Sequence, residues 1–173
     1  MITSGVIVEV EAYIGEDDPA CHAAPGPTTR NAPLYGPPGF SYVYLNYGIH
    51  SMMNVVTEGE GSPAAVLLRA LDPLDGVDIM RRRRSRAAKG RRRQSGTTLD
   101  TSALCRGPGN LTMAMGITLT DNRRDLRGNR LYIEDRGIRM ERPVWGPRIG
   151  IRVGTETPWR CALSDHPAVS GRS

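Results

Sequence analysis

The sequence has few cysteines, one lysine and no long apolar run. Its three cysteines, Cys21, Cys105 and Cys161, are scattered without the C-x-x-C spacing of zinc ribbons or iron–sulfur proteins. We therefore expect neither a disulfide scaffold nor a metal site. Hydrophobic residues make up 39% of the chain, and no apolar stretch approaches the roughly 20 residues of a membrane span. Met1–Ser4 has no basic leader and starts no apolar signal segment, so we expect a cytoplasmic protein without a membrane partner.

Length and charge indicate one domain with one basic segment. A chain of 173 residues can bury one core but not two comfortable ones, so we expect a single domain over residues 1–173. The formal net charge is +5, yet eight arginines and the only lysine, Lys89, lie between Arg81 and Arg93. We interpret residues 81–98 as a basic, mobile loop. Such a run favours a polyanionic partner, and a merely solvated surface loop is the alternative.

Hydrophobic patterning predicts strands and helices in one chain. Residues 5–13 alternate strictly, with Glu9, Glu11 and Tyr13 on one face, as in an edge strand or a strand that faces a cleft. Residues 40–56 are rich in β-branched and aromatic side chains around a turn at Tyr47, which predicts a hairpin. The other expected elements are a buried strand at 64–70, a helix at 75–86, a helix capped by Asn110, and short strands at 131–134 and 149–153.

Side chains that can carry chemistry gather in the first seventy residues. Six of the nine aromatic residues precede residue 50, which suits a stacking pocket for a planar ligand or a hairpin held by cross-strand aromatic pairs. Glu9 and Glu11 share a strand face, so they are either an acid–base pair or ordinary exposed acids. Arg69 interrupts an apolar strand and needs a carboxylate partner, for which Glu11 is the candidate. Tyr47, at the hairpin tip, could act as a wedge between bases.

Four motifs, in order along the chain, resemble those of one enzyme family. They are VEVEAYIGEDDPACH, TTRNAPLYGPPGFSYVYLNYGIHSMMNVV, AAVLLRALDPLDG and LCRGPGNLTMAMGI. They closely resemble the alkyladenine (3-methyladenine) DNA glycosylases, which excise purines in base excision repair. The resemblance implies a mixed α/β (α+β) domain with a curved antiparallel sheet and a protruding β-hairpin that inserts into DNA. It also implies that the family's usual N-terminal helix and strand are missing from this chain.

The resemblance implies a catalytic pair and a base pocket. Glu11 matches the general base that activates water for attack on the sugar C1′, so Glu9 should matter less. Arg69 matches the arginine that helps to hold this water, and the backbone near Leu163 matches a segment that lines the water site. The residues matching the base pocket are Tyr13 on one face of the flipped base, His22 and Tyr44 on the other, and Asn54, which discriminates against the guanine amino group.

The expected function is a monofunctional glycosylase that acts as a monomer on double-stranded DNA containing damaged purines, without a cofactor. Tyr47 matches the intercalating residue of the family. From the basic run, we expect Arg81, Arg82, Arg83 and Arg84 to contact the DNA backbone. Alkylated purines are good leaving groups, so one carboxylate suffices for hydrolysis, whereas a lyase needs an amine.

Two other functions are compatible with parts of the sequence. In the first, the chain is a non-catalytic nucleic-acid-binding module, and the basic run does the binding. Release of a free purine would distinguish the glycosylase from this module. In the second, Glu9 and Glu11 serve an ordinary sugar hydrolase, although two carboxylates on one strand face do not straddle a sugar ring.

Overall fold

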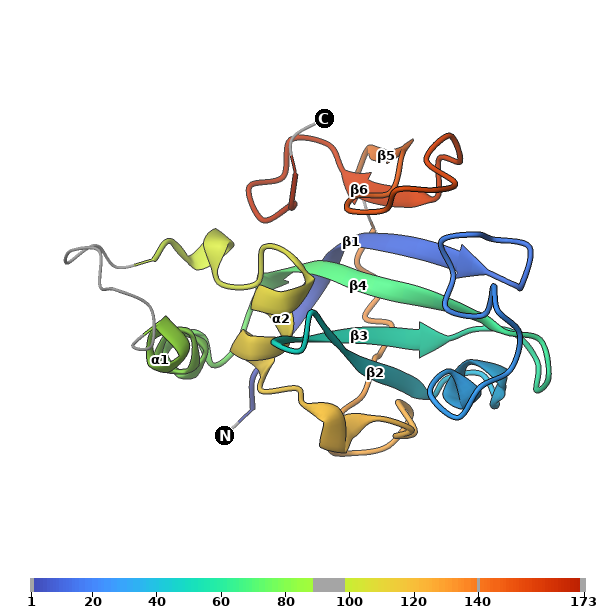
Figure 1. Ribbon diagram of the computed structural model, residues 1–173. Helices are drawn as coiled ribbons and strands as arrows, with labels where there is room; N and C mark the ends of the chain where they lie inside the picture. The colour runs from blue at the N-terminus through green and yellow to red at the C-terminus, as the bar shows by residue number, and fades with distance from the viewer. Residues whose placement is uncertain (1, 89–98, 140, 172–173) are drawn as a thin grey trace.

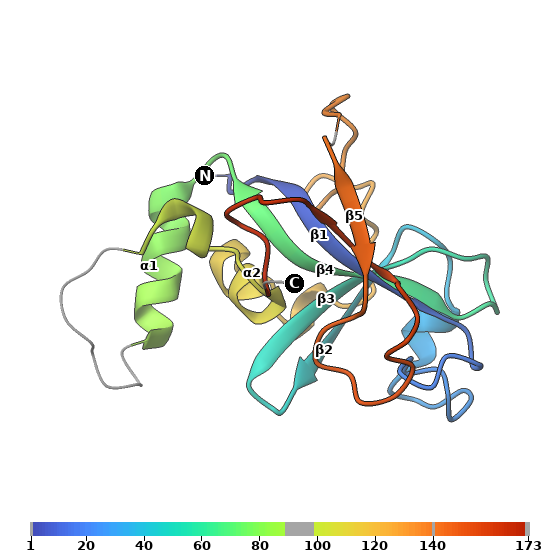
Figure 2. The ribbon, with the colours of Figure 1, turned by 90° about the horizontal axis from the view of Figure 1, so that it is seen from above.

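An antiparallel sheet lies at the centre of the computed structural model, which describes residues 2–88, 99–139 and 141–171. Within these residues the strand order is β2-β3-β4-β1-β6-β5, and the sheet is twisted (Figures 1 and 2). The strands are β1 (Gly5–Ile14), β2 (Ser41–Asn46), β3 (His50–Val56), β4 (Ala64–Pro73), β5 (Pro143–Gly146) and β6 (Arg160–Leu163). Every neighbouring pair is antiparallel.

Two helices cover one end of the sheet. Helix α2 (Pro108–Met115) packs against β3 and β4, and α1 (Val77–Ala88) packs against α2 (Figure 1). Their shared core contains Met53, Met80 and Leu111, all at most 1% exposed. Burying each such side chain contributes roughly 1.5–3 kcal/mol, so this core fixes β3 and β4 relative to the helices. Within the described part of the chain, no helix is both long and apolar enough to cross a membrane.

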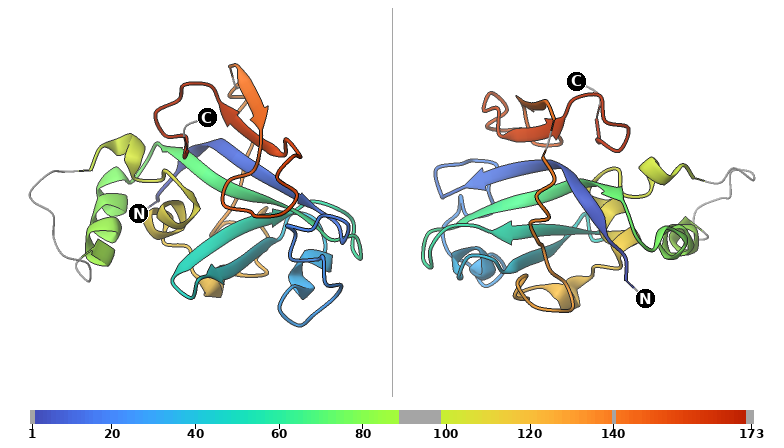
Figure 3. Two further views of the ribbon diagram at one scale, coloured as in Figure 1. Left: turned by 45° about the horizontal axis from the view of Figure 1, so that its top comes forward. Right: turned by 180° about the vertical axis from the view of Figure 1, so that it is seen from behind.

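The chain between Asn122 and β5 contains no described strand. It runs as coil across the back of the sheet (Figure 3). The strand predicted at 131–134 is therefore wrong. The strand predicted at 149–153 is also wrong, because these residues lie in the loop between β5 and β6, which are the last two strands described. The apolar pattern of residues 149–153 has another cause, because Ile149 and Ile151 line a cavity.

The N-terminus of α2 differs from the sequence prediction. The N-cap is Gly107 and not Asn110, whose side chain instead donates to the carbonyl of Arg106 at 2.7 Å. Gly107 has a φ of 91°, a conformation that suits glycine. Pro108 then supplies a preset φ at the first helical position. The helix therefore begins at Pro108, and its N-cap lies three residues before Asn110.

Strand β1 is an interior strand, so of the two predicted alternatives the edge strand is wrong, and the strand that faces a cleft agrees with Tyr13, which lines a cavity. It lies between β4 and β6. Its ladder with β4 pairs Glu9 with Ala70 and then Val10 with Leu68, so the register skips Arg69. Such an irregularity bends the strand and redirects side chains, and is common beside functional sites. Here it lies where Arg69 meets two glutamates.

The first half of the basic run is helical and not a loop. Residues 81–88 belong to α1, while 89–98 lie outside the described residues. Arg83 donates to the carbonyl oxygens of Ala114 and Met115 at the end of α2, at 2.9 and 2.8 Å. Cationic groups stabilise helix C-termini in this way. The helix predicted at 75–86 is thereby confirmed, and its arginines bind protein carbonyls, a contact that the charge pattern alone did not reveal.

Candidate active site

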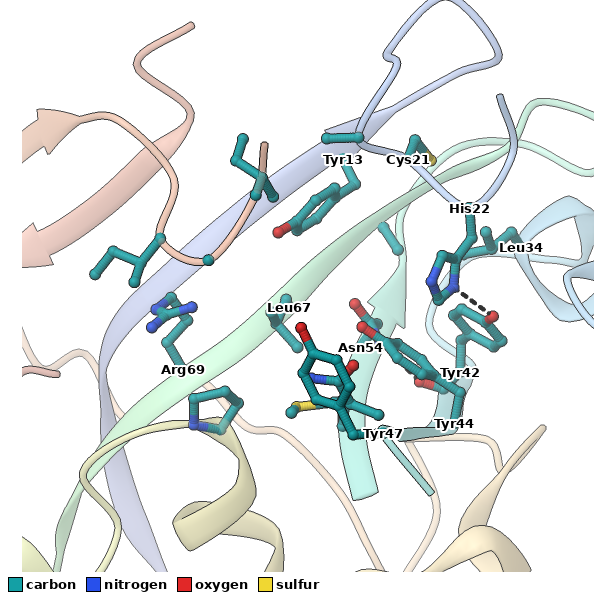
Figure 4. Close-up of a pocket in the computed structure, with 18 residues that line it drawn as sticks. Tyr13, Cys21, His22, Leu34, Tyr42, Tyr44, Tyr47, Asn54, Leu67 and Arg69 are labelled. Carbon is teal, nitrogen blue, oxygen red and sulfur yellow. Dashed lines mark hydrogen bonds between the residues drawn. The ribbon is translucent and has the colours of Figure 1, made fainter. Parts of the chain in front are cut away.

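A cavity of about 380 Å³ opens between β1, the β2–β3 hairpin and the loop after β5 (Figure 4). This size lies within the range of pockets for small molecules. All four residues predicted for a base pocket line this cavity, namely Tyr13, His22, Tyr44 and Asn54. Arg69 and Tyr47 line it as well. Sequence reasoning therefore selected side chains that the fold brings together from β1, the loop that follows it, and the hairpin.

Aromatic rings form two facing walls of the cavity. Tyr13 lies on one side, and His22 and Tyr44 lie on the other with their ring centroids 4.4 Å apart (Figure 4). Nδ1 of His22 is 2.9 Å from the hydroxyl of Tyr42. Burial lowers the pKa of His22, with a further contribution from Arg30, so the imidazole is neutral at pH 7. A cavity between neutral rings suits a flat heteroaromatic ligand.

Asn54 supplies a fixed polar group among these rings. Its side chain is nearly buried, and its amide nitrogen donates to the carbonyl of Tyr42 at 3.1 Å. The hydrogen bond fixes which way the amide faces. A few fixed polar groups in an apolar pocket select a ligand by its hydrogen-bonding edge.

Glu11 lies beneath the cavity with no solvent exposure. Its Oε1 accepts the backbone N–H of Ile149 at 2.7 Å and pairs with Nη1 of Arg69 at 3.1 Å. Its Oε2 accepts the hydroxyl of Tyr13 at 2.9 Å. The Arg69–Glu11 pair is confirmed. The backbone group at this carboxylate belongs to Ile149, so the prediction that the chain near Leu163 lines this point is wrong.

Tyr13 and Glu11 affect one another electrostatically. Burial raises the pKa of Tyr13 well above its usual value, and the neighbouring Glu11 carboxylate raises it further. The phenol is therefore protonated at physiological pH and donates its hydrogen to Glu11. One side chain thus forms both a wall of the cavity and a contact to the carboxylate.

Glu9 anchors the ion-pair cluster and is not an exposed acid. It is 1% exposed, and its oxygens accept hydrogen bonds from Nε of Arg69 at 3.0 Å and Nε of Arg160 at 2.7 Å. The backbone N–H of Ser170 is a third donor, at 2.6 Å. A carboxylate whose oxygens are held by two arginines and a backbone amide is not free to exchange protons with a substrate. The geometry therefore disfavours the sugar hydrolase, which needs both glutamates.

Sequence reasoning missed a second buried ion pair. Asp18 binds Nη1 and Nη2 of Arg148 at 2.6 and 2.8 Å, and both side chains are at most 1% exposed. Burial alone would raise the pKa of Asp18, but hydrogen bonds from Arg148 and the Ala20 amide keep it below its usual value. The two partners are 130 residues apart in the sequence, so no local pattern predicts their pairing. The only sequence signal in this region was the long acidic loop after β1, because such loops are often functional.

The hairpin turn places Tyr47 in solvent. Tyr47 and Gly48 have φ values of 50° and 69°, and the N–H of Ile49 donates to Asn46 at 3.1 Å. Tyr47 is 84% exposed and Ile49 is 63% exposed. A bulky residue at positive φ is uncommon and strained. The turn thus presents two apolar side chains to solvent at the rim of the cavity.

The arginines predicted to contact DNA have different surroundings. Arg81 donates to the carbonyl of Leu99 at 2.5 Å, and Arg84 donates to that of Leu104 at 2.5 Å. Arg83 binds the end of α2, whereas Arg82 is exposed. DNA contact by these four residues stays a prediction. Among the described residues, no group of three His, Cys, Asp or Glu side chains could hold a metal ion.

The cavity with aromatic walls, next to a buried carboxylate–arginine pair, suits a planar ligand. Residues 1–167 match the sequence model of a family described as methylpurine-DNA glycosylase (MPG), and the chain belongs to this family. The family resemblance stated from the sequence motifs is thereby confirmed.

Bacterial relatives match along most of the chain. One from Rubrobacter xylanophilus is 49% identical over 158 residues, which cover 91% of this chain and 75% of the relative. Another, from Chlorobaculum parvum, is 44% identical over 171 residues, covering 98% of this chain and 76% of the relative. A third, from Rhodopseudomonas palustris, is 48% identical over 162 residues, which cover 93% of this chain and 71% of the relative. The provisional designation of all three is 3-methyladenine DNA glycosylase.

Proposed function

We propose that this protein is a monofunctional DNA glycosylase of base excision repair. It acts as a monomer on double-stranded DNA and excises alkylated or deaminated purines by base flipping and attack of water at C1′. The observation that carries this proposal is the Glu11–Arg69 pair, buried directly beneath a cavity with aromatic walls. The names of the relatives, 3-methyladenine DNA glycosylases, agree with it.

The cavity suits a base that has left the duplex. A base inside the helix cannot be reached, so the enzyme must extrude it and stack it in a pocket. Stacking on an aromatic ring contributes roughly 1–3 kcal/mol per base, and Tyr13 and Tyr44 offer rings on two sides (Figure 4). Tyr47, exposed at the rim, fills the gap that the extruded nucleotide leaves. Its strained position then has a function that packing in the free protein does not supply.

The carboxylate of Glu11 acts as the general base. Its Oε2 accepts one hydrogen bond, from Tyr13, and a carboxylate oxygen has a second lone pair that can accept a proton from water. Arg69 holds the other oxygen. A cationic alkylated purine leaves readily, so a positioned water and this base complete its hydrolysis. Neutral lesions such as hypoxanthine need added hydrogen bonds, for which Asn54 lies in the cavity.

Release of free purine tests the proposal. Duplexes containing 3-methyladenine, ethenoadenine or hypoxanthine are incubated with the protein, and the products are separated by chromatography. We expect free purine and an abasic strand that breaks only after alkali, and no release from the matched undamaged duplex. Strand breaks before alkali would show lyase activity and contradict a monofunctional enzyme. Salt-dependent binding without free purine would identify a non-catalytic binding module.

A further inference from the structure

The Asp18–Arg148 pair lies next to the cavity but outside its lining. Asp18 follows β1, and Arg148 lies in the loop after β5, directly before Ile149, which lines the cavity. Both guanidinium Nη atoms bind one carboxylate, with neither side chain more than 1% exposed. Replacing a buried ion pair by well-packed apolar residues is often neutral or stabilising. Stability is therefore a weak explanation for this pair, and its place beside the cavity points to a role in orientation.

Arg148 is in contact with the wall of the cavity. Its guanidinium carbon lies 4.6 Å from the ring centroid of Tyr13 and 5.1 Å from that of Trp159. Its Nη1 also donates to the carbonyl of Ala12 at 3.0 Å, and its Nη2 to that of Gly154 at 3.4 Å. Tyr13 lines the cavity and Arg148 does not. The guanidinium therefore packs against the Tyr13 ring without lining the cavity itself.

The same arginine determines the position of a donor to Glu11. The backbone N–H of the next residue, Ile149, donates to Glu11 at 2.7 Å. A hydrogen bond of this length is lost when its atoms separate by about 1 Å. Because Ile149 is covalently joined to Arg148, a shift of the arginine also moves this amide. One ion pair is thus mechanically connected to the stacking wall and to the carboxylate.

We propose that Asp18 and Arg148 are positioning residues that hold Tyr13 and Glu11 in the arrangement required for excision. The proposal rests on the proposed function and adds two residues to its machinery. Neither residue contacts the cavity, so both act through Tyr13 and Ile149. A planar guanidinium can bind a carboxylate through two nitrogens while packing against rings, which an ammonium cannot do. Arg148→Lys therefore removes the positioning while keeping the charge.

The experiment compares Arg148→Lys and Asp18→Asn with Asp121→Asn. Asp121 pairs with Arg124 at 3.2 Å and does not line the cavity, so its variant is a matched control for loss of an ion pair. Amide hydrogen exchange in the free protein, followed by NMR, reports on Ile149. We expect exchange there to become at least about tenfold faster in Arg148→Lys and Asp18→Asn. In Asp121→Asn it should stay as in the wild type.

Kinetics on an ethenoadenine duplex provide the second measurement. Misplacing reacting groups by about 1 Å costs on the order of 10²-fold in rate. We expect the single-turnover rate to fall by about this factor in Arg148→Lys and Asp18→Asn, while affinity for the duplex changes by less than about threefold. In the double variant, Asp18→Asn should reduce the rate little beyond the effect of Arg148→Lys, since both substitutions remove the same interaction. Independent, additive losses would overturn the proposal.

The two measurements separate this inference from the proposed function. A wild-type protein that releases no purine contradicts the glycosylase, while exchange at Ile149 still tests the positioning. An active wild type with unchanged Ile149 exchange in Arg148→Lys and Asp18→Asn overturns the positioning alone. If Asp18→Asn, which leaves the Arg148 guanidinium buried without its carboxylate, does not fold, the charge-conserving Arg148→Lys decides the outcome.

Discussion

Glu9→Gln should damage stability more than its conservative chemistry suggests. In the native protein, Glu9 accepts hydrogen bonds from Arg69, Arg160 and the Ser170 amide. Glutamine keeps the shape but removes the charge, so Arg69 then keeps only its pair with Glu11, and Arg160 loses the carboxylate that it binds in the native protein. Leaving a buried charge uncompensated costs about 3–5 kcal/mol. That is a large part of a typical total stability of roughly 5–15 kcal/mol.

Thermal unfolding followed by circular dichroism at pH 7 measures this cost. For a domain of this size, 1 kcal/mol corresponds to about 2–4 °C in melting temperature, so a decrease of roughly 6–20 °C follows. Glu16→Gln is the matched control, because that carboxylate is exposed and accepts the hydroxyl of Tyr35; it should change stability by less than about 0.5 kcal/mol. A Glu9→Gln melting temperature within about 2 °C of the wild type would refute the anchoring role.

Three further predictions concern the hairpin, the pocket histidine and helix α1. Tyr47→Ser should leave the melting temperature unchanged and slow excision from duplex more than from single-stranded DNA, because it removes stacking worth a few kcal/mol. Equal slowing on both substrates, or loss of stability, would contradict the role of Tyr47 as a wedge. Tyr132→Ser is the control. Burial lowers the pKa of His22, so the unfolded state binds more protons and the free energy of unfolding should decrease as pH falls below about 6.5. His22→Gln should make this decrease shallower in urea titrations, and an unchanged slope would contradict it. Arg82→Gln should reduce the salt slope of DNA binding by about 1 with little loss of stability, whereas Arg83→Gln should mainly lower the melting temperature; the reverse pattern would contradict the placement of these arginines.

The sequence predicted those features that depend on local pattern. Alternation located β1, turn residues located the hairpin around Tyr47, and an arginine within an apolar run indicated its buried partner Glu11. The motifs supplied the pocket residues, which the fold brings together at one cavity. The strand and the hairpin are encoded in local patterns, the need of Arg69 for a partner is evident from its apolar neighbours, and the pocket residues are given by the motifs. They could therefore be inferred without three-dimensional information.

Features that depend on distant segments could not be predicted in this way. Glu9 and Glu11 look equivalent in the sequence, yet Arg160 and Ser170 distinguish them through contacts made about 150 residues away. The Asp18–Arg148 pair is of the same kind. The helix at 75–86 was predicted and is confirmed by α1, but the charge pattern did not show that Arg83 binds the end of α2. Long-range partners, more than residue type, determine these roles.

The most direct test of the account is the excision rate of Glu11→Gln. The amide oxygen can still accept the Ile149 N–H, and the amide nitrogen can donate to Tyr13, so folding and lesion binding should persist. Without a group that accepts the proton of water, the single-turnover rate on a lesion duplex should fall by about 10²–10⁴-fold, while Glu16→Gln keeps the wild-type rate. Excision by Glu11→Gln within about threefold of the wild type would show that Glu11 is not the base and contradict the mechanism.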